Sequence, residues 1–271
     1  MQPLRSLLFI FILLIITVFS LESQSDLHDG YQLVWAEEFD YSGLPDSTKW
    51  GFETKGNKHG WGNNEKQYYT SNNLSNAMVE DGVLKIIARK EQKENRHYTS
   101  ARLSSADKAE FKYGLIEIRA KLPAGTGTWP AIWMLGQNRN VAGWPDCGEI
   151  DIMEHVGYEP DSVHGTIHTA AYNHIKRTQK GGGIVLKDPY DEFHVYAIEW
   201  TPEKIDFMVD GKVYYNVVNE HLTDKEWPFD QPFYLILNIA IGGNWGGKKG
   251  IDDSIFPVEM HVDWVRVYQK E

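Results

Sequence analysis

The stretch CGEIDIMEH, residues 147–155, places three carboxylic acids inside a run of apolar residues. Residues i and i+2 of a strand face the same side, so Glu149 and Asp151 share one face and the aliphatic residues between them share the other. Glu154 comes one residue too late for that face. A β-bulge near Ile152 would absorb the extra residue and bring Glu154 back into line. The stretch therefore predicts three carboxyls in a row on one face of a sheet.

Paired carboxyls on a sheet face are typical of glycoside hydrolysis. Two glutamates that flank a sugar cleave it with retention when their carboxyls lie roughly 5–5.5 Å apart. The backbones of Glu149 and Glu154 are farther apart, about 13 Å at about 3.3 Å per residue, so their side chains must lean together over the shorter Asp151. Repulsion between the acids raises at least one pKa, as an acid catalyst requires. The alternative is a solvated strand face with alternating charge, and the surrounding sequence argues against it.

Short strand patterns separated by turns fill the rest of the chain. Asp210-Gly211 lies between two alternating runs and is a strong hairpin signal, and Asp81-Gly82 marks another turn. Residues 219–226 form the one helix candidate. Many short strands without intervening helices predict an all-β, antiparallel β-sandwich or jelly roll. The predicted strands are residues 33–39, 83–88, 101–103, 114–122, 131–135, 163–168, 194–200, 204–209, 233–241 and 260–268.

The first residues are expected to be an export signal rather than part of the fold. Arg5 gives a positive start, residues 7–19 are apolar, and small residues around Ser25 suit cleavage. Residues 1–25 are thus predicted to be a signal peptide, with an uncleaved anchor as the alternative. The mature chain, residues 26–271, is long enough for one domain with a sizeable core. We expect a secreted protein, extracellular or periplasmic, with no membrane association after cleavage.

The cysteine count and the net charge limit the disulfides that can form and the classes of molecule that the protein can bind. Cys147 is the only cysteine, so no internal disulfide can form. A buried apolar thiol is a better interpretation of Cys147 than a nucleophile, because no activating histidine is evident. The formal net charge is −11, which disfavours nucleic acid or an anionic polysaccharide and permits a neutral glycan. We expect a monomer.

The active-site segment is similar to a known family. Residues 129–157, WPAIWMLGQNRNVAGWPDCGEIDIMEHVG, resemble the active-site strand of family-16 glycoside hydrolases. The longer form E-I-D-I-M-E resembles the laminarinase-like, endo-1,3-β-glucanase branch, whereas the lichenase and xyloglucan branches have E-x-D-x-E. The similarity extends along nearly the whole mature chain. It implies a β-jelly roll in which a concave sheet forms the substrate cleft.

Ten tryptophans are many for 271 residues. An aromatic face stacks on the apolar face of a pyranose and orders little on binding. Four tryptophans close to the acids or in a glycine-rich loop are predicted to stack on sugars, with core packing as the alternative: Trp129, Trp133, Trp144 and Trp245. Trp61 fits either role equally. Five others lie in strand or core-like contexts and are predicted to pack: Trp35, Trp50, Trp200, Trp227 and Trp264.

The resemblance also implies roles for polar residues. Asn64, Glu65, Arg102 and His168 match positions of the family's N-N-E, S-A-R-L and T-x-H segments. It implies that Asn64 and Arg102 hydrogen-bond sugar hydroxyls near the cleavage point, and that His168 and His155 contact or tune the acids. Each residue alone is more typical of a satisfied structural polar group.

A structural calcium ion is implied by the resemblance alone. Glu38, the carbonyl of Gly82 and Asp263 match the family's calcium site on the convex side, and hard oxygen ligands suit Ca²⁺. No organic cofactor is expected for catalysis.

The sequence is interpreted as a retaining endo-1,3-β-glucanase of laminarin type. Glu149 is the predicted nucleophile and Glu154 the acid and base, while Asp151 orients the nucleophile and sets its protonation. The enzyme alternatives are a mixed-linkage 1,3-1,4-β-glucanase and an agarose-type galactan hydrolase. The alternative from another class is a non-catalytic β-glucan-binding protein, since the same fold serves both. The presence of both glutamates argues for the enzyme.

Overall fold

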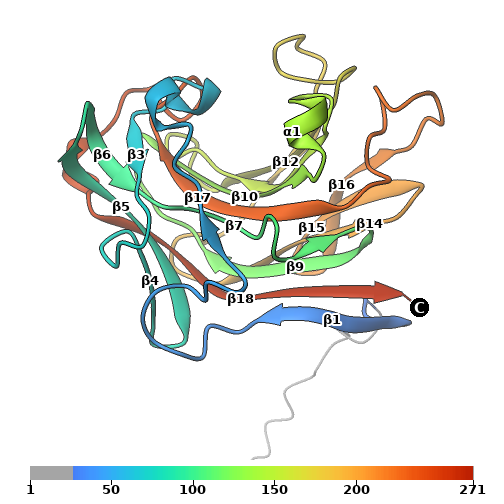
Figure 1. Ribbon diagram of the computed structural model, residues 1–271, viewed down its shortest axis with the longest axis horizontal. Helices are drawn as coiled ribbons and strands as arrows, with labels where there is room; N and C mark the ends of the chain where they lie inside the picture. Colours follow the sequence, from blue (N-terminus) through green and yellow to red (C-terminus); the bar gives the residue numbers. More distant parts are fainter. Residues whose placement is uncertain (1–26, 271) are drawn as a thin grey trace, which may run out of the picture.

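Two curved β-sheets packed face to face make up the part of the chain that the structure describes, residues 27–270 (Figure 1). The structure is a computed structural model, and the predicted signal peptide of residues 1–25 lies outside the described residues. Neighbouring strands are antiparallel except β3 and β6, which pair in parallel. The prediction of an all-β, antiparallel sandwich is confirmed.

The outer sheet has ten strands. In spatial order they are β16 (Lys212–Val218), β15 (Lys204–Val209), β14 (His194–Trp200), β9 (Gly114–Lys121), β18 (Val258–Lys270), β5 (Val83–Lys93), β6 (Arg96–Ser100) and β3 (Gln67–Tyr69), with β1 (Tyr31–Glu37) beside β18 and β4 (Ala77–Glu80) beside β5.

The second sheet, called the cleft sheet below, has eight strands and lies above the outer sheet in Figure 1. In order they are β13 (Lys180–Val185), β12 (Ser162–His168), β11 (Glu149–Glu154), β10 (Thr128–Gly136), β17 (Phe233–Ile241), β7 (Arg102–Ser104) and β2 (Gly51–Phe52), with β8 (Glu110–Phe111) beside β17.

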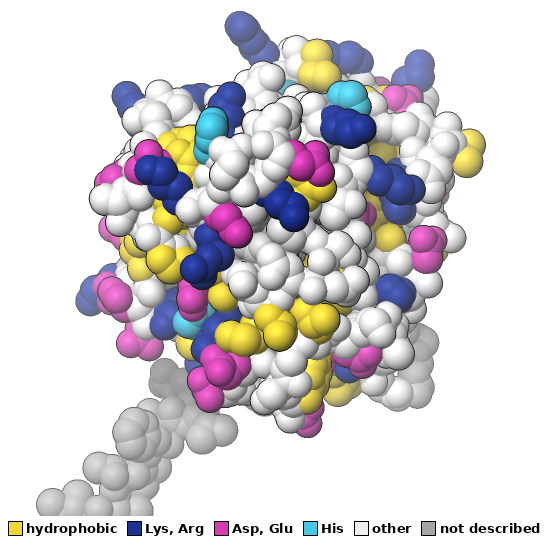
Figure 2. Space-filling view, turned by 60° about the vertical axis from the view of Figure 1, so that its left-hand side comes forward, with side chains coloured by type: hydrophobic (Ala, Val, Ile, Leu, Met, Phe, Trp, Pro, Cys, Tyr) yellow, Lys and Arg dark blue, Asp and Glu magenta, His cyan; other side chains and the backbone are white. Residues whose placement is uncertain are grey.

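The core fills the space between the sheets because strand side chains alternate. In β11 the aliphatic residues Ile150 and Ile152 are 0% and 1% exposed, so the acids between them must face away from the core. Every residue of β17 is buried, since one face of β17 meets the core and the other lies under the cleft. Figure 2 shows an outer face on which basic and acidic side chains are mixed, with hydrophobic side chains gathered in its lower half.

Helices are short in the described chain. They are η1 (Asn57–Gly62), α1 (Arg139–Ala142) and η2 (Asp253–Ile255), and none within residues 27–270 is long and apolar enough to span a bilayer. The predicted helix over residues 219–226 is wrong. Only one turn forms there, closed by the amides of Glu226 and Trp227 on the carbonyl of Thr223, because Pro228 follows and cannot continue the ladder.

The hairpin at Asp210-Gly211 is confirmed. It joins β15 to β16, and both turn residues have positive φ, 50° and 74°, as a type I′ turn requires. Each of the ten predicted strands overlaps an observed strand. The strand β13 was not predicted, because its sequence KGGGIV offers three glycines and no alternating pattern.

Four of the five tryptophans predicted to pack do so. Trp50, Trp200 and Trp227 are buried and Trp35 packs partly buried against the core. Trp264 is not in the core, so its prediction is wrong. A bulge in β18 between Val262 and Trp264 makes two consecutive residues face outward. The Arg266 guanidinium covers the half-buried indole at 4.2 Å from its centroid.

Replacing Trp200 or Trp264 with alanine is expected to reduce the free energy of unfolding by different amounts. Trp200 is fully buried and meets Tyr113 and Phe233 edge to face, so Trp200→Ala should lower the free energy of unfolding by about 3–5 kcal/mol. Trp264→Ala should cost about 1 kcal/mol or less, since a surface ring leaves no cavity. Urea denaturation of both variants measures the difference. Equal losses would place Trp264 back in the core.

Candidate active site

The strand β11 carries the predicted bulge. On β10 the neighbours Ile132 and Trp133 pair with Met153 and Asp151, which leaves Ile152 as the extra residue. The same irregularity interrupts the pairing of β11 with β12. All three acids therefore emerge on one face of the cleft sheet, as the sequence predicted.

These acids line a cleft of about 1110 Å³ on the exposed face of the cleft sheet. The wall on one side comes from η1 and the loop after β17, and on the other from β12, β13 and the loop between them. Most residues predicted for the site line this cleft: Arg102, Trp129, Trp133, Trp144, Glu149, Asp151, Glu154, His168 and Trp245.

Two tryptophans hold the two glutamates. The indole Nε1 of Trp144, in the loop before β11, donates to Glu149 Oε2 at 3.0 Å. The indole Nε1 of Trp129, on β10, donates to Glu154 Oε1 at 2.9 Å. Because each indole uses its edge for the acid, the hydrogen bond itself leaves the ring faces available for packing or for contact with a sugar. Holding the acids is a role that the sequence did not predict for these tryptophans.

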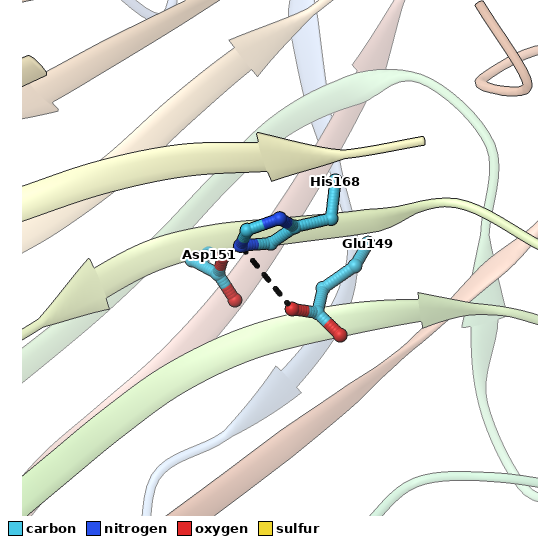
Figure 3. A group of neighbouring side chains, drawn as sticks. All are labelled: Glu149, Asp151 and His168. Carbon is cyan, nitrogen blue, oxygen red and sulfur yellow. Dashed lines mark ion pairs between the residues drawn. The ribbon is translucent and has the colours of Figure 1, made fainter. Parts of the chain in front are cut away.

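His168 lies against Asp151 and Glu149. Its Nε2 is 3.4 Å from Asp151 Oδ2 and 3.8 Å from Glu149 Oε1, and Figure 3 shows its ring over both carboxyls. Burial, and then the neighbouring His174, lower the pKa of His168 to about 4. The imidazole is therefore neutral at neutral pH and packs against the acids as a neutral polar ring rather than as a cation.

Burial raises the pKa of all three acids above the ordinary carboxyl range. Repulsion from Glu154 further raises the pKa of Glu149, and repulsion from both glutamates further raises that of Asp151. The hydrogen bond between Asp151 and Glu149 lowers the pKa of Glu149 and raises that of Asp151. Asp151 thus keeps its proton and donates it to Glu149.

The donors distinguish the two glutamates. Glu149 accepts from the Trp144 indole and from Asp151, whereas Glu154 accepts from the Trp129 indole alone. Hydrogen bonds to the charged form favour ionisation. Burial and repulsion nevertheless raise the pKa of Glu149 to about 8, above the value of about 7 for Glu154. The donor sets thus orient the two glutamates without fixing which one holds the proton.

The group Glu149, Asp151 and His168 is compact enough to hold a metal, with potential ligand atoms within 4.8 Å of one another. The proton shared by Asp151 and Glu149 accounts for the close approach of the carboxyls without an ion. We assign no metal to this group.

Arg102 lies in the cleft, where the sequence expected it. Its guanidinium sits between the rings of Trp61 and Trp133, 4.4 and 4.6 Å from their centroids, and its Nε donates to Glu53 at 2.8 Å. Trp133 is itself fixed by a 2.8 Å hydrogen bond to Asn238. This stack places Trp61 in the cleft and fixes the direction of the arginine N–H groups.

Trp245, in the loop after β17, lies beside Trp129 at a centroid distance of 5.6 Å. The glycines around it permit the approach. A Cβ on Gly246 would lie 2.8 Å from the Trp129 Cβ and 2.7 Å from the carbonyl oxygen of Gly242, closer than real Cβ contacts.

Two predicted substrate residues lie elsewhere. Asn64 is exposed and has a left-handed backbone, φ 57°, which turns its side chain to Asn244 at 2.8 Å. Asn63 lines the cleft in its place. Asn64 is thus outside the cleft lining, and its hydrogen bond to a sugar hydroxyl stays a prediction.

His155 faces the interior rather than the cleft, so its predicted contact with the acids is wrong. Its side chain is buried, with Nδ1 at 2.8 Å from the Ser162 carbonyl and Nε2 at 3.0 Å from the Tyr190 hydroxyl. The reason is alternation: His155 directly follows Glu154, which faces the cleft.

The sequence also missed residues that the loops bring in. His174, between β12 and β13, lies nearly parallel to the Trp144 ring at 5.0 Å and edge-on to His168 at 5.2 Å. No strand pattern points to His174. Its position depends on Asn173, whose buried side chain bonds the carbonyls of Thr169 and Ala170.

The residues predicted to bind calcium are engaged with arginines. Both Glu38 oxygens accept from Arg266 at 2.9 Å, and Asp263 accepts from Arg119. As arranged, these carboxylates are neutralised by guanidinium groups and do not fit a calcium ion unless both arginines move. Calcium binding by Glu38, Asp263 and the carbonyl of Gly82 remains a prediction.

Comparison with known proteins identifies the family. A family model described as glycosyl hydrolases family 16 matches residues 64–266. The chain belongs to glycosyl hydrolase family 16. The resemblance carried by residues 129–157 is thereby confirmed, and the protein is a glycoside hydrolase.

Relatives within family 16 cover nearly the whole chain. A β-glucanase of Rhodothermus marinus is 58% identical, over 91% of this chain and 88% of that protein. The solved laminarinase from Rhodothermus marinus has a TM-score of 0.86 at 56% identity, over 88% of this chain and 97% of that one. SCLam, a non-specific endo-β-1,3(4)-glucanase, has a TM-score of 0.86 at 48% identity, over 90% and 92% of the two chains.

The raised pKa values predict how stability responds to pH. A group whose pKa is raised on folding contributes fully below its unfolded value, here about 4.5, and loses that contribution as pH rises through the folded value, about 7 for Glu154. Glu154→Gln removes this loss. Its melting temperature should exceed that of the parent at pH 8 by about 2–4 °C for each kcal/mol of relief, and the difference should vanish near pH 4.

Calorimetry across this pH range measures the effect. Glu192→Gln, at an exposed position, is the matched control and should leave the curve unchanged. A Glu154→Gln protein with the parental pH dependence would contradict the raised pKa.

Proposed function

We propose that this family-16 enzyme hydrolyses internal 1,3-linkages of β-glucan with retention of configuration. The observation that supports this most is the bulged strand β11, which sets Glu149, Asp151 and Glu154 on one face with a different donor set for each glutamate. The relatives named β-glucanase and laminarinase support the linkage.

The mechanism assigns each acid one task. The Glu149 carboxylate attacks the anomeric carbon while Glu154 gives its proton to the departing glycosidic oxygen, and a covalent glycosyl-enzyme forms. Glu154, now ionised, takes a proton from water, and the resulting hydroxide displaces Glu149. Asp151 donates its proton in a hydrogen bond to Glu149 and so keeps the nucleophile oriented.

Substrate binding uses the cleft walls. The Arg102 guanidinium, held between two indoles, presents N–H groups to sugar hydroxyls, and Trp133 and Trp245 offer ring faces on either side of the acids. The neutral His168 holds the Asp151 and Glu149 carboxyls in place.

Mixed-linkage 1,3-1,4-β-glucan is the second candidate substrate. The similarity to SCLam, named as non-specific for 1,3(4) linkages, favours it. Galactan hydrolysis has weaker support, from a keratan-sulfate endo-1,4-β-galactosidase 37% identical to this chain. A non-catalytic role has a relative too, a β-1,3-glucan-binding protein matching 55% of this chain, but both glutamates are present here and are held by donors.

Export, a monomeric state and structural calcium stay proposals. Export rests on the charge and hydropathy of residues 1–25. The calcium proposal requires Arg119 and Arg266 to release their carboxylates.

Removing the nucleophile should abolish turnover. Glu149→Ala should keep the melting temperature and glucan binding but release no reducing ends from laminarin. Azide should partly restore cleavage of an activated glycoside and give a glycosyl azide of inverted configuration, because azide then attacks from the vacated face. Glu154→Ala should instead give an azide product of retained configuration. Substantial laminarin hydrolysis by Glu149→Ala would reject the nucleophile, and parallel assays on lichenan and agarose separate the substrate candidates.

The cleft tryptophans should affect catalysis rather than stability. Trp133→Ala and Trp245→Ala remove half-buried rings that line the cleft, so we expect a drop in kcat/KM on laminarin with a small change in melting temperature. Trp200→Ala is the control and should show the reverse pattern. A Trp245→Ala protein that melts far lower yet cleaves normally would remove Trp245 from the site.

A further inference from the structure

Two loops at one end of the cleft carry an excess of positive charge. Residues 54–67, which include η1, and residues 242–250 contain a single acid, Glu65, which is buried. The same loops carry six basic side chains, called the basic rim below: Lys55, Lys58, His59, Lys66, Lys248 and Lys249. The rim contrasts with the net charge of −11 for the whole chain.

The two loops form one surface. The amide of Asn244 donates to the carbonyl of Asn63 at 2.8 Å, and Glu65 forms an isolated bridge with Gly242. Both loops lie at the upper left of Figure 1, and Figure 2, which brings that side forward, shows basic side chains projecting along its upper edge. His59 and Lys248 line the cleft itself.

The lysines of the rim are exposed and make no ion pair or ring contact within residues 27–270. Elsewhere in that part of the chain lysines commonly have a partner: Lys49, Lys85, Lys90, Lys180, Lys204 and Lys270 pair with acids. Five neighbouring unpaired ammonium groups repel one another, so the arrangement costs stability unless a ligand uses it.

Acids on the adjoining elements are already engaged. Glu94 accepts from the Tyr68 hydroxyl. Asp252 caps η2 through Ser254, and Asp253 pairs with Lys90 and accepts from Tyr98. Only Asp253 is neutralised by a cation, so Glu94 and Asp252 offset part of the positive potential. The two loops themselves still carry five exposed lysines against one buried acid.

We propose that the basic rim binds anionic substituents, carboxylate or sulfate, on a glucan chain whose neutral part lies across the acids. Clefts lined by one sign of charge concentrate ligands of the opposite sign, and the rim is continuous with the cleft through His59 and Lys248. The net charge of the chain indicates a neutral substrate at the acids, while the rim extends binding to acidic chains at one end. This inference rests on the proposed glucanase function.

The test compares a neutral and an anionic form of one polymer. Laminarin and partially carboxymethylated laminarin are assayed for reducing ends at low salt and at about 0.5 M salt, where screening shortens the range of charge. The variant Lys55→Glu/Lys58→Glu/Lys249→Glu, at rim positions outside the cleft lining, should raise KM for the carboxymethylated polymer at low salt by on the order of ten-fold. KM for laminarin should stay unchanged, and the effect should shrink at high salt.

A second triple variant controls for net charge. Lys112→Glu/Lys187→Glu/Lys212→Glu changes exposed lysines outside both loops and outside the cleft lining, and it should behave like the parent. Two results would contradict anion binding by the rim. One is an equal rise of KM in both triple variants, and the other is an equal rise of KM on laminarin and on the carboxymethylated polymer. If the parent does not cleave laminarin, the proposed function fails instead. Affinity gels cast with the carboxymethylated polymer then still test anion binding by the rim. Equal salt-dependent retardation of the Lys55/Lys58/Lys249 variant and of the parent would reject that binding.

Discussion

The extra residue in β11 is the constraint on which the site depends. Without the bulge at Ile152, alternation would send Glu154 into the core and an aliphatic side chain into the cleft. The bulge lets one strand satisfy two demands, since Ile150 and Ile152 pack in the core while three carboxyls face the cleft. The neighbouring strand β10 must follow the same register, and it places Trp129 where its indole meets the displaced Glu154.

Three carboxyls on one face oppose folding, and the surrounding residues limit that cost without removing it. Burial and mutual repulsion raise their pKa values, so the group holds protons where isolated carboxyls would lose them. Each indole satisfies one glutamate oxygen. Asp151 Oδ2 has no hydrogen-bond partner among the described residues, although the neutral His168 approaches it to 3.4 Å. The donors orient the two glutamates, while burial and repulsion set pKa values of about 8 for Glu149 and about 7 for Glu154.

The sequence predicted what periodicity controls. The acids, the bulge and the order of the long strands follow from alternation, and a single bulge was visible as an i+5 spacing. Alternation also excludes His155 from the cleft, and only the matched family motif had favoured it. Alternation misleads where the backbone departs from regular geometry. At Trp264 a second bulge turns the ring outward, and at Asn64 a left-handed φ turns the side chain to Asn244. His174 depends on a loop closed by Asn173, which no pattern of period 2 can locate.

The cleft has two regions of different charge, the buried acids at its centre and the lysines of the basic rim. The net charge of the whole chain does not reveal this difference. At its centre the carboxyls are buried and partly protonated, so a neutral sugar meets little charge. At the η1 end five exposed lysines without partners among the described residues create a positive potential that solvent and salt can screen. Because the central charges are fixed by short hydrogen bonds and the rim charges are not, ionic strength should alter recognition at the rim while leaving the chemistry at Glu149 and Glu154 unchanged. Binding of anionic substituents at the rim and cleavage of the glycosidic bond at the acids are therefore separable properties of one cleft.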